Sequence, residues 1–226
     1  MGRSRTGVVP TTAGAISTAM TAATGPFDCG LSVFSADGTN LEYSTVFGGS
    51  LLDVPSSIVT DSQGAIYVMG TTGSSDFPVT AGAYDESYCA NGAIDLSACC
   101  FYPGFGGTPN GTNLYVMKFS PVAGGSTLQA STYVGGCNGP SGVNRGDYLA
   151  YNYGDVFRGE INVDDQDRPW VASVTGASDF PTVGGGFGTY GGGTTDAVVF
   201  RLSADLSALE WSTFLGGSQD LSLIHI

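Results

Sequence analysis

Three acidic residues near the middle of the chain are the best candidates for catalysis. Asp147, Asp155 and Glu160 could supply the two carboxylates with which glycosidases cleave a sugar linkage. Their spacing fixes no distance between two carboxylates, so a carbohydrate-active enzyme is the alternative function. The only histidine is His225, beside the last residue, which leaves none elsewhere for a Ser-His-Asp triad or an imidazole metal site. We therefore expect a non-catalytic protein that needs no cofactor.

A second acidic group consists of Asp164, Asp165 and Asp167. Carboxylate oxygens are the ligands that calcium prefers, so this group raises the question of a metal site. However, the spacing is not that of an EF-hand loop, and the corresponding turn at Asp61 contains one acid. We expect no bound metal.

The five cysteines are the other reactive side chains. They are Cys29, Cys89, Cys99, Cys100 and Cys137, and none of them forms a CxxC pair. This pattern favours disulfides in an oxidising compartment over a zinc site. Because the number is odd, at least one thiol stays unpaired within the chain, and buried free cysteines are the alternative interpretation.

The composition limits the partners. The formal net charge is −13 and only 12% of the residues are charged, so phosphate backbones are poor partners and we expect no nucleic acid. No apolar run approaches the roughly 20 residues of a membrane span. Hydrophobic residues make up 42% of the 226 residues, which is enough for a large all-β core.

A repeat organises the chain. Ser-Thr-Tyr-Val-Gly-Gly at 131–136 recurs with small changes at 44–49 and 212–217, and Ser-Asp-Phe-Pro occurs at 75–78 and 178–181. Markers that recur in a fixed order indicate a repeat protein. We interpret each Gly-Gly pair as packing at a strand end, and each aspartate of Ser-Asp-Phe-Pro as a cap of its own turn.

The apolar runs between these markers predict β-strands. Several runs are apolar on both faces, which is typical of sheets that are stacked on both sides. We predict an all-β partial β-propeller of four-stranded antiparallel blades, with about two and a half blades present. The predicted blades are a half-blade at 10–49 with strands near 31–35 and 41–47, a blade at 50–136 with strands near 57–60, 65–71, 114–120 and 129–134, and a blade at 137–217 with strands near 160–163, 170–174, 197–202 and 209–215.

The order of these motifs resembles the bacterial SBBP β-propeller repeat family. The resemblance rests on residues 43–49, 59–64, 67–70, 75–78 and 196–203. It implies a propeller-like module of a secreted or cell-surface protein, without an established set of catalytic residues. We therefore expect an extracellular or surface-exposed bacterial protein of which this chain is a fragment that does not include the export signal.

Two positions depart from the repeat pattern. Asp167 stands where the corresponding turn at 61–64 has a glycine. The last six residues, 221–226, continue no repeat, and we interpret them as an artefactual tail.

Two insertions distinguish the units from one another. The first, at 85–112, carries three cysteines, and the second, at 137–158, is rich in tyrosine and polar residues. Because both occupy connections at the same end of a meander, we expect them to meet on one face, with a disulfide from Cys137 to Cys89, Cys99 or Cys100. Aromatic rings mixed with polar groups suit sugar or protein contact. The predicted binding residues, for a protein or polysaccharide partner, are Arg145, Asp147, Tyr148, Tyr151, Asn152 and Tyr153.

Overall fold

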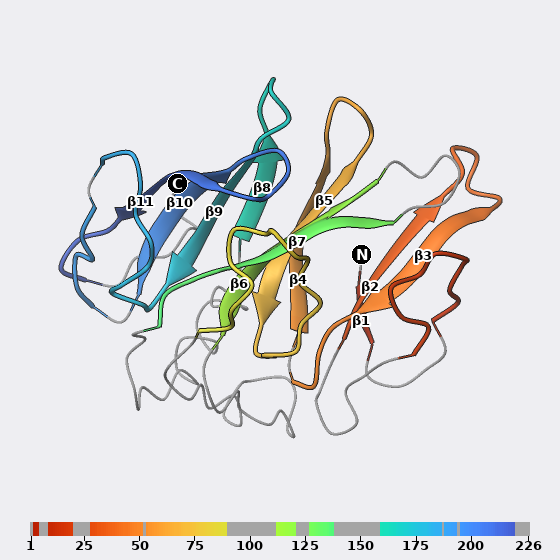
Figure 1. Cartoon of the computed structure of the whole chain (residues 1–226), viewed down its shortest axis with the longest axis horizontal. Coiled ribbons are helices and arrows are strands. Elements are labelled where there is room, and N and C mark those ends of the chain that lie inside the picture. Colours follow the sequence, from red (N-terminus) through yellow and green to blue (C-terminus); the bar gives the residue numbers. More distant parts are fainter. Residues whose placement is uncertain are drawn as a thin grey trace.

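The computed structural model describes residues 2–4, 9–19, 28–51, 53–89, 112–120, 127–137, 159–186, 188–193 and 195–219. Every regular element in these ranges is a β-strand, and the strands form three antiparallel sheets that stand side by side (Figure 1). The predicted all-β, propeller-like fold is therefore confirmed. The described ranges also contain no helix that is long and apolar enough to cross a membrane.

Within each sheet the strands follow one another in chain order. The first sheet has the order β1-β2-β3, and the other two are four-stranded meanders. Each predicted strand is present within a few residues of its expected bounds, and β4 begins earlier than expected. The strands are β1 (Gly2–Ser4), β2 (Asp28–Phe34), β3 (Leu41–Phe47), β4 (Asp53–Thr60), β5 (Ile66–Thr72), β6 (Asn113–Phe119), β7 (Leu128–Val134), β8 (Gly159–Val163), β9 (Pro169–Thr175), β10 (Asp196–Leu202) and β11 (Leu209–Leu215).

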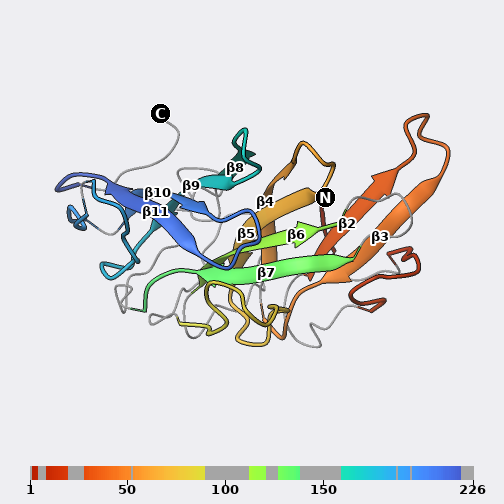
Figure 2. The ribbon, with the colours of Figure 1, turned by 45° about the horizontal axis from the view of Figure 1, so that its top comes forward.

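The middle sheet is covered on both faces, as its doubly apolar strands predict. Alternate side chains of β5 and β6 point to opposite faces, because side chains in a strand alternate with a period of two. One face packs on the third sheet through Tyr67, Met69, Leu114 and Val116, and the other packs on the first sheet through Ile66, Val68, Tyr115, Met117 and Phe119. Figure 2 shows the three sheets as successive layers.

The tight turns between the first two strands of each full sheet have the same design. Asp61 accepts hydrogen bonds from the backbone N–H groups of Gln63 (3.0 Å) and Ala65 (2.8 Å). Asp164 accepts from the equivalent N–H groups at Gln166 and Arg168, both at 3.0 Å. These bonds preorganise each turn for the strand that follows.

Asp167 preserves the turn geometry at the position where the other turn has a glycine. Its φ of 58° is left-handed, like the 82° of Gly64, and aspartate tolerates this conformation better than most residues. Its carboxylate accepts two hydrogen bonds from Ser62, each 2.9 Å long, so it also ties the third sheet to the middle one. Among the described residues no group of three or more His, Cys, Asp and Glu could hold a metal ion.

The outer edge of each sheet is covered by a connection from the same sheet. The backbone N–H of Thr12 donates to Ser44 O on β3, that of Thr80 donates to Ser131 O on β7, and Ser212 on β11 donates to Val183 O. Unpaired strand edges promote aggregation. The segments at 10–15, 78–83 and 181–186, which begin with proline and contain these residues, therefore protect the outermost strands.

Candidate binding end at the bases of the two insertions

The aspartates of the Ser-Asp-Phe-Pro motifs lie at one end of the sheets, where each chain connection passes from one sheet to the next. Asp76 accepts hydrogen bonds from the backbone N–H (2.8 Å) and the hydroxyl (3.0 Å) of Ser50, and Asp179 accepts from the N–H of Cys137 (3.1 Å). For Asp76, the expectation that the aspartate caps its own turn is therefore wrong. Each one holds the incoming connection from the preceding sheet, and sequence alone does not reveal this long-range partner.

The Gly-Gly pairs pack against polar side chains at this same end. A Cβ atom on Gly48 would come within 2.8 Å of the Asp28 carboxylate, and a Cβ on Gly135 or Gly216 would overlap Asn113 or Asp196. Real Cβ atoms do not make such contacts, so only glycine lets the backbone approach this closely. The prediction of strand-end packing is confirmed.

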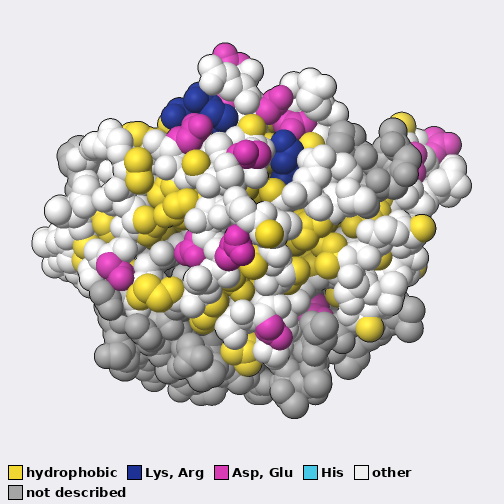
Figure 3. All heavy atoms as spheres, in the orientation of Figure 1, with side chains coloured by type: hydrophobic (Ala, Val, Ile, Leu, Met, Phe, Trp, Pro, Cys, Tyr) yellow, Lys and Arg dark blue, Asp and Glu magenta, His cyan; other side chains and the backbone are white. Residues whose placement is uncertain are grey.

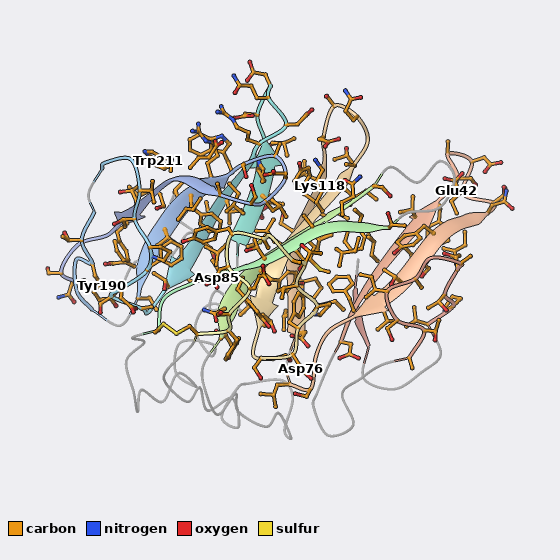
Figure 4. The ribbon with its side chains drawn as sticks, viewed as in Figure 1. Glu42, Asp76, Asp85, Lys118, Tyr190 and Trp211 are labelled. Carbon is orange, nitrogen blue, oxygen red and sulfur yellow. A yellow bond between two sulfur atoms is a disulfide. The ribbon has the colours of Figure 1, made fainter. Side chains whose placement is uncertain are left out.

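A disulfide joins the bases of the two insertions. Cys89, near the start of the first insertion, is bonded to Cys137, at the start of the second, and their Cα atoms are 4.9 Å apart. Figure 4 shows the bond in yellow at the lower end of the molecule. The predicted disulfide is thus present, with Cys89 as the partner. The two insertions begin at one place, as the meander topology predicts.

Asn113 adds a second clamp to the first insertion. Its side-chain oxygen accepts from the backbone N–H of Cys89 (2.9 Å), and its amide group donates to the Cys89 carbonyl (2.8 Å). Asn113 begins β6 at the position that Asp28 and Asp196 occupy in the other sheets. An amide can both donate and accept, whereas an ionised carboxylate only accepts, so the change to asparagine suits a two-way backbone clamp.

The segment that leads to Cys89 is anchored along β7. Asp85 accepts a hydrogen bond from the N–H of Tyr133 through its carbonyl (3.0 Å), and its own N–H donates to the Thr132 hydroxyl (2.9 Å). The Tyr88 ring packs edge-on against the Tyr133 ring at 5.7 Å, and burial raises the pKa of Tyr88 well above its usual range. The base of the first insertion is therefore part of the rigid sheet.

Two buried carboxylates lie beside Gly48 at the same end of the first two sheets. Asp53 is fully buried and accepts hydrogen bonds from the N–H of Gly49 (2.7 Å) and the hydroxyl of Ser74 (3.1 Å). The pKa of Asp53 is raised to about 6, mainly by burial and also by the nearby charge of Asp28, while these hydrogen bonds oppose the shift. Both carboxylates are closed off from solvent, so they cannot act on a large substrate.

The predicted binding residues of the second insertion, Arg145, Asp147, Tyr148, Tyr151, Asn152 and Tyr153, lie outside the described residues, as do Cys99, Cys100 and Asp155. Glu160 is described: it is exposed on β8 and accepts a hydrogen bond from the Ser57 hydroxyl (3.0 Å). Cys29 is a free, buried thiol whose sulfur lies 3.3 Å from the Tyr115 hydroxyl. Sequence reasoning missed Asn113, and its alignment with Asp28 and Asp196 is the signal that could have found it.

Stacked four-stranded antiparallel meanders, linked at one end by repeated Asp-to-backbone contacts, define this chain as a propeller-like repeat protein. Residues 42–78 match the family model of the SBBP beta-propeller repeat. The match runs from β3 through β4 and β5 to the first Ser-Asp-Phe-Pro motif, so this stretch is similar to one copy of that repeat. No curated protein matches the chain.

Proposed function

We propose that this chain is a non-catalytic, extracellular β-propeller module whose insertion-bearing end binds a protein or a glycan within a larger surface or secreted protein. The observation that carries the proposal is the disulfide between Cys89 and Cys137, which brings the bases of both insertions together on a rigid sheet. Binding residues concentrate on loops that a rigid scaffold positions.

The chemistry of the second insertion fits such a partner. Tyrosine rings offer flat apolar faces to sugars or to protein side chains, and the asparagine, aspartate and arginine between them can fix orientation through hydrogen bonds. The candidate contact residues remain Arg145, Asp147, Tyr148, Tyr151, Asn152 and Tyr153.

The location and the excluded partners rest on separate observations. A disulfide is compatible with an oxidising, extracellular compartment. The net charge of −13 disfavours a nucleic acid partner, because phosphate backbones are bound through excess positive charge.

Binding to a panel of soluble polysaccharides and surface proteins tests the proposal. The test variant carries Tyr148→Ala, Tyr151→Ala and Tyr153→Ala, which keep the disulfide and the clamp at Asn113. Its matched control is Gln63→Ala, an exposed substitution in the turn at the opposite end of the middle sheet. We expect the triple variant to lose binding and the control to keep it. Full binding by the triple variant would contradict the proposed surface.

The same panel distinguishes binding from catalysis. A carbohydrate-active enzyme would release shortened products, and Asp147→Asn would abolish that release if Asp147 served as one of two catalytic carboxylates. Turnover with this dependence would replace the proposed function by the enzymatic alternative. Binding without turnover supports the module.

A further inference from the structure

The contact between the middle and third sheets has a polar rim that binds two turns of the third sheet, one between β8 and β9 and one between β10 and β11. The Tyr67 hydroxyl lies within hydrogen-bond distance of two carbonyls, Ala204 O (2.9 Å) and Asp167 O (3.0 Å), and Lys118 Nζ also donates to Ala204 O (3.0 Å). The Lys118 ammonium sits over the Tyr67 ring at 4.8 Å. An aromatic ring and a cation on neighbouring strands thus capture the carbonyl of the turn between β10 and β11.

The outer face of the third sheet repeats this rim. Trp170 pairs with Arg201 in the register of β9 and β10, as Tyr67 pairs with Lys118 in the register of β5 and β6. The Arg201 guanidinium sits 5.1 Å from the centre of the Trp170 ring, and the Trp211 ring lies 5.5 Å from that of Trp170. Lys118 and Trp211 both lie toward the upper end of neighbouring sheets in Figure 4.

In the space-filling view, basic side chains gather beside acidic and hydrophobic ones at the upper rim of the molecule (Figure 3). Trp170, Trp211 and Arg201 are half-buried, whereas Tyr67 is fully buried beneath the third sheet. The outer face of the third sheet therefore carries an aromatic ring and a cation in the arrangement that binds a turn on the middle sheet, and no described sheet lies on it.

The turn that docks on the middle sheet also has a twin elsewhere in the chain. In the docked turn, Ser203 Oγ donates to Asp205 (2.6 Å) and accepts from the N–H of Ala208 (3.0 Å). In the turn between β2 and β3, Ser35 Oγ donates to Asp37 (2.6 Å) and accepts from the N–H of Asn40 (3.0 Å). The two turns have the same Ser-Ala-Asp sequence, so Ala36 O corresponds to Ala204 O.

An exposed aromatic residue stands beside the undocked turn. Phe34, at the end of β2, is 60% exposed to solvent. This is the highest exposed fraction among the large hydrophobic residues that the structure describes. Its counterpart on β6, Phe119, is fully buried and lies 6.3 Å from the Tyr43 ring of the first sheet. Tyr43 in turn corresponds to Trp211, because Leu-Glu-Tyr-Ser-Thr on β3 aligns with Leu-Glu-Trp-Ser-Thr on β11.

We propose that a second copy of this chain docks head to tail on the outer face of the third sheet. The turn at 35–40 and Phe34 of one copy would contact Trp170, Arg201 and Trp211 of the other. Ala36 O would accept from the Arg201 guanidinium, and Phe34 would pack on Trp211 as Phe119 packs near Tyr43. The chain contains an example of each half of this contact between its own sheets. The turn between β10 and β11 binds Tyr67 and Lys118 of the middle sheet, and Phe119 of the middle sheet lies near Tyr43 of the first sheet.

The stacking geometry sets the expected size of the assembly. A contact between two different faces of the same chain is heterologous and forms a ring when the rotation closes. The described residues supply three sheets, so a ring of two copies would have six of them, and closed propellers have about four to eight. For the 226-residue chain purified by itself we therefore expect a closed dimer.

Sedimentation velocity and light scattering of the purified chain over a wide concentration range test this proposal. We expect a dimer, and we expect Phe34→Ser to weaken self-association by about tenfold or more, because buried aromatic anchors dominate such interfaces. Val183→Ser is the matched control: Val183 is also an exposed hydrophobic residue, at 41%, but it lies on the edge-covering connection of the third sheet. The control should dimerise like the parent chain.

A mixing experiment tests the head-to-tail arrangement. Arg201→Ala removes the donor on one face and Phe34→Ser removes the anchor on the other, so each variant alone should be mostly monomeric. In an equal mixture, the intact Phe34 of the Arg201→Ala variant can contact the intact Arg201 of the Phe34→Ser variant. Each mixed pair therefore retains one intact contact, and the mixture should form mixed dimers. Thermal melts of each variant establish that it is folded before it is compared.

Several results would overturn the proposal. They are a parent chain that remains monomeric at every concentration, equal weakening by Val183→Ser and Phe34→Ser, or a folded mixture that forms no mixed dimer. A parent chain that remains monomeric would indicate that the outer face of the third sheet binds a different kind of partner.

Discussion

Replacing the buried Asp53 with asparagine should stabilise the protein at neutral pH. The Asp53 carboxyl has a folded-state pKa of about 6, compared with an ordinary value of 3.8, mainly because burial disfavours its charge. Asparagine removes that charge, while its side-chain oxygen can still accept from Gly49 and Ser74. The neutral amide also removes the repulsion between positions 53 and 28.

The sign and size follow from proton linkage. Below about pH 4 the carboxyl is protonated in both folded and unfolded chains, so it imposes no penalty. As the pH rises from about 4 to about 6, this carboxyl ionises in the unfolded chain before it ionises in the folded protein. The unfolding free energy therefore falls by about 1.4 kcal/mol for each unit by which the two pKa values differ. The total is about 3 kcal/mol, reached above pH 6. Asp53→Asn should remove most of this loss.

Urea unfolding of both proteins between pH 4 and pH 8 measures the effect. The difference in unfolding free energy should be small near pH 4 and should grow to about 3 kcal/mol by pH 7. Asp205→Asn is the control, because hydrogen bonds from Ser203 and Ser207 lower the pKa of Asp205 to about 2, below this range. Its curve should run parallel to that of the parent chain. A pH-independent difference for Asp53→Asn would refute the linkage argument.

Three further predictions concern the disulfide, a strand-end glycine and the contact between the middle and third sheets. Cys137→Ser should lower the unfolding free energy by up to about 4 kcal/mol for the 48-residue separation, and a reducing agent should then affect only the parent chain. Gly216→Ala should cost about 1–3 kcal/mol because its Cβ would overlap Asp196, whereas Gly217→Ala, which meets nothing within 4 Å, should change stability by under about 0.5 kcal/mol. Tyr67→Phe should cost about 1–3 kcal/mol in thermal or urea unfolding, since the single O–H that is shared between Ala204 O and Asp167 O is lost, while Lys118 still donates to Ala204 O; an unchanged midpoint would contradict a structural role for this rim.

Strand positions could be predicted because local pattern determines them. The runs around Tyr67 and Trp170 are bounded by Asp turns and recur in order, so even the correspondence between these two aromatic residues was predictable from the sequence. The bridge to Cys137 was narrowed to three partners by topology alone. Choosing Cys89 required its position beside Asn113, which only the folded sheet provides.

Contacts between sheets were the part that the sequence did not reveal. Asp76 resembles a local cap, yet it binds Ser50, because β4 runs away from this end of the sheet and β5 brings the chain back to it. Asp53 shows no sequence signal of burial, since it stands near glycines and serines that normally indicate an exposed loop. Local propensity describes a turn, whereas the partner of a charged side chain depends on how neighbouring sheets stack.

The clamp between Asn113 and Cys89 makes this chain suitable as a display scaffold. The two ends of the first insertion are held together by two hydrogen bonds between the Asn113 side chain and the Cys89 backbone, and the disulfide secures the same point. The entropic cost of closing a loop rises slowly with its length, by about 0.6 kcal/mol for each doubling. Foreign peptides of different lengths should therefore be tolerated between residues 89 and 113, and libraries grafted at this position could be selected for new binding specificities.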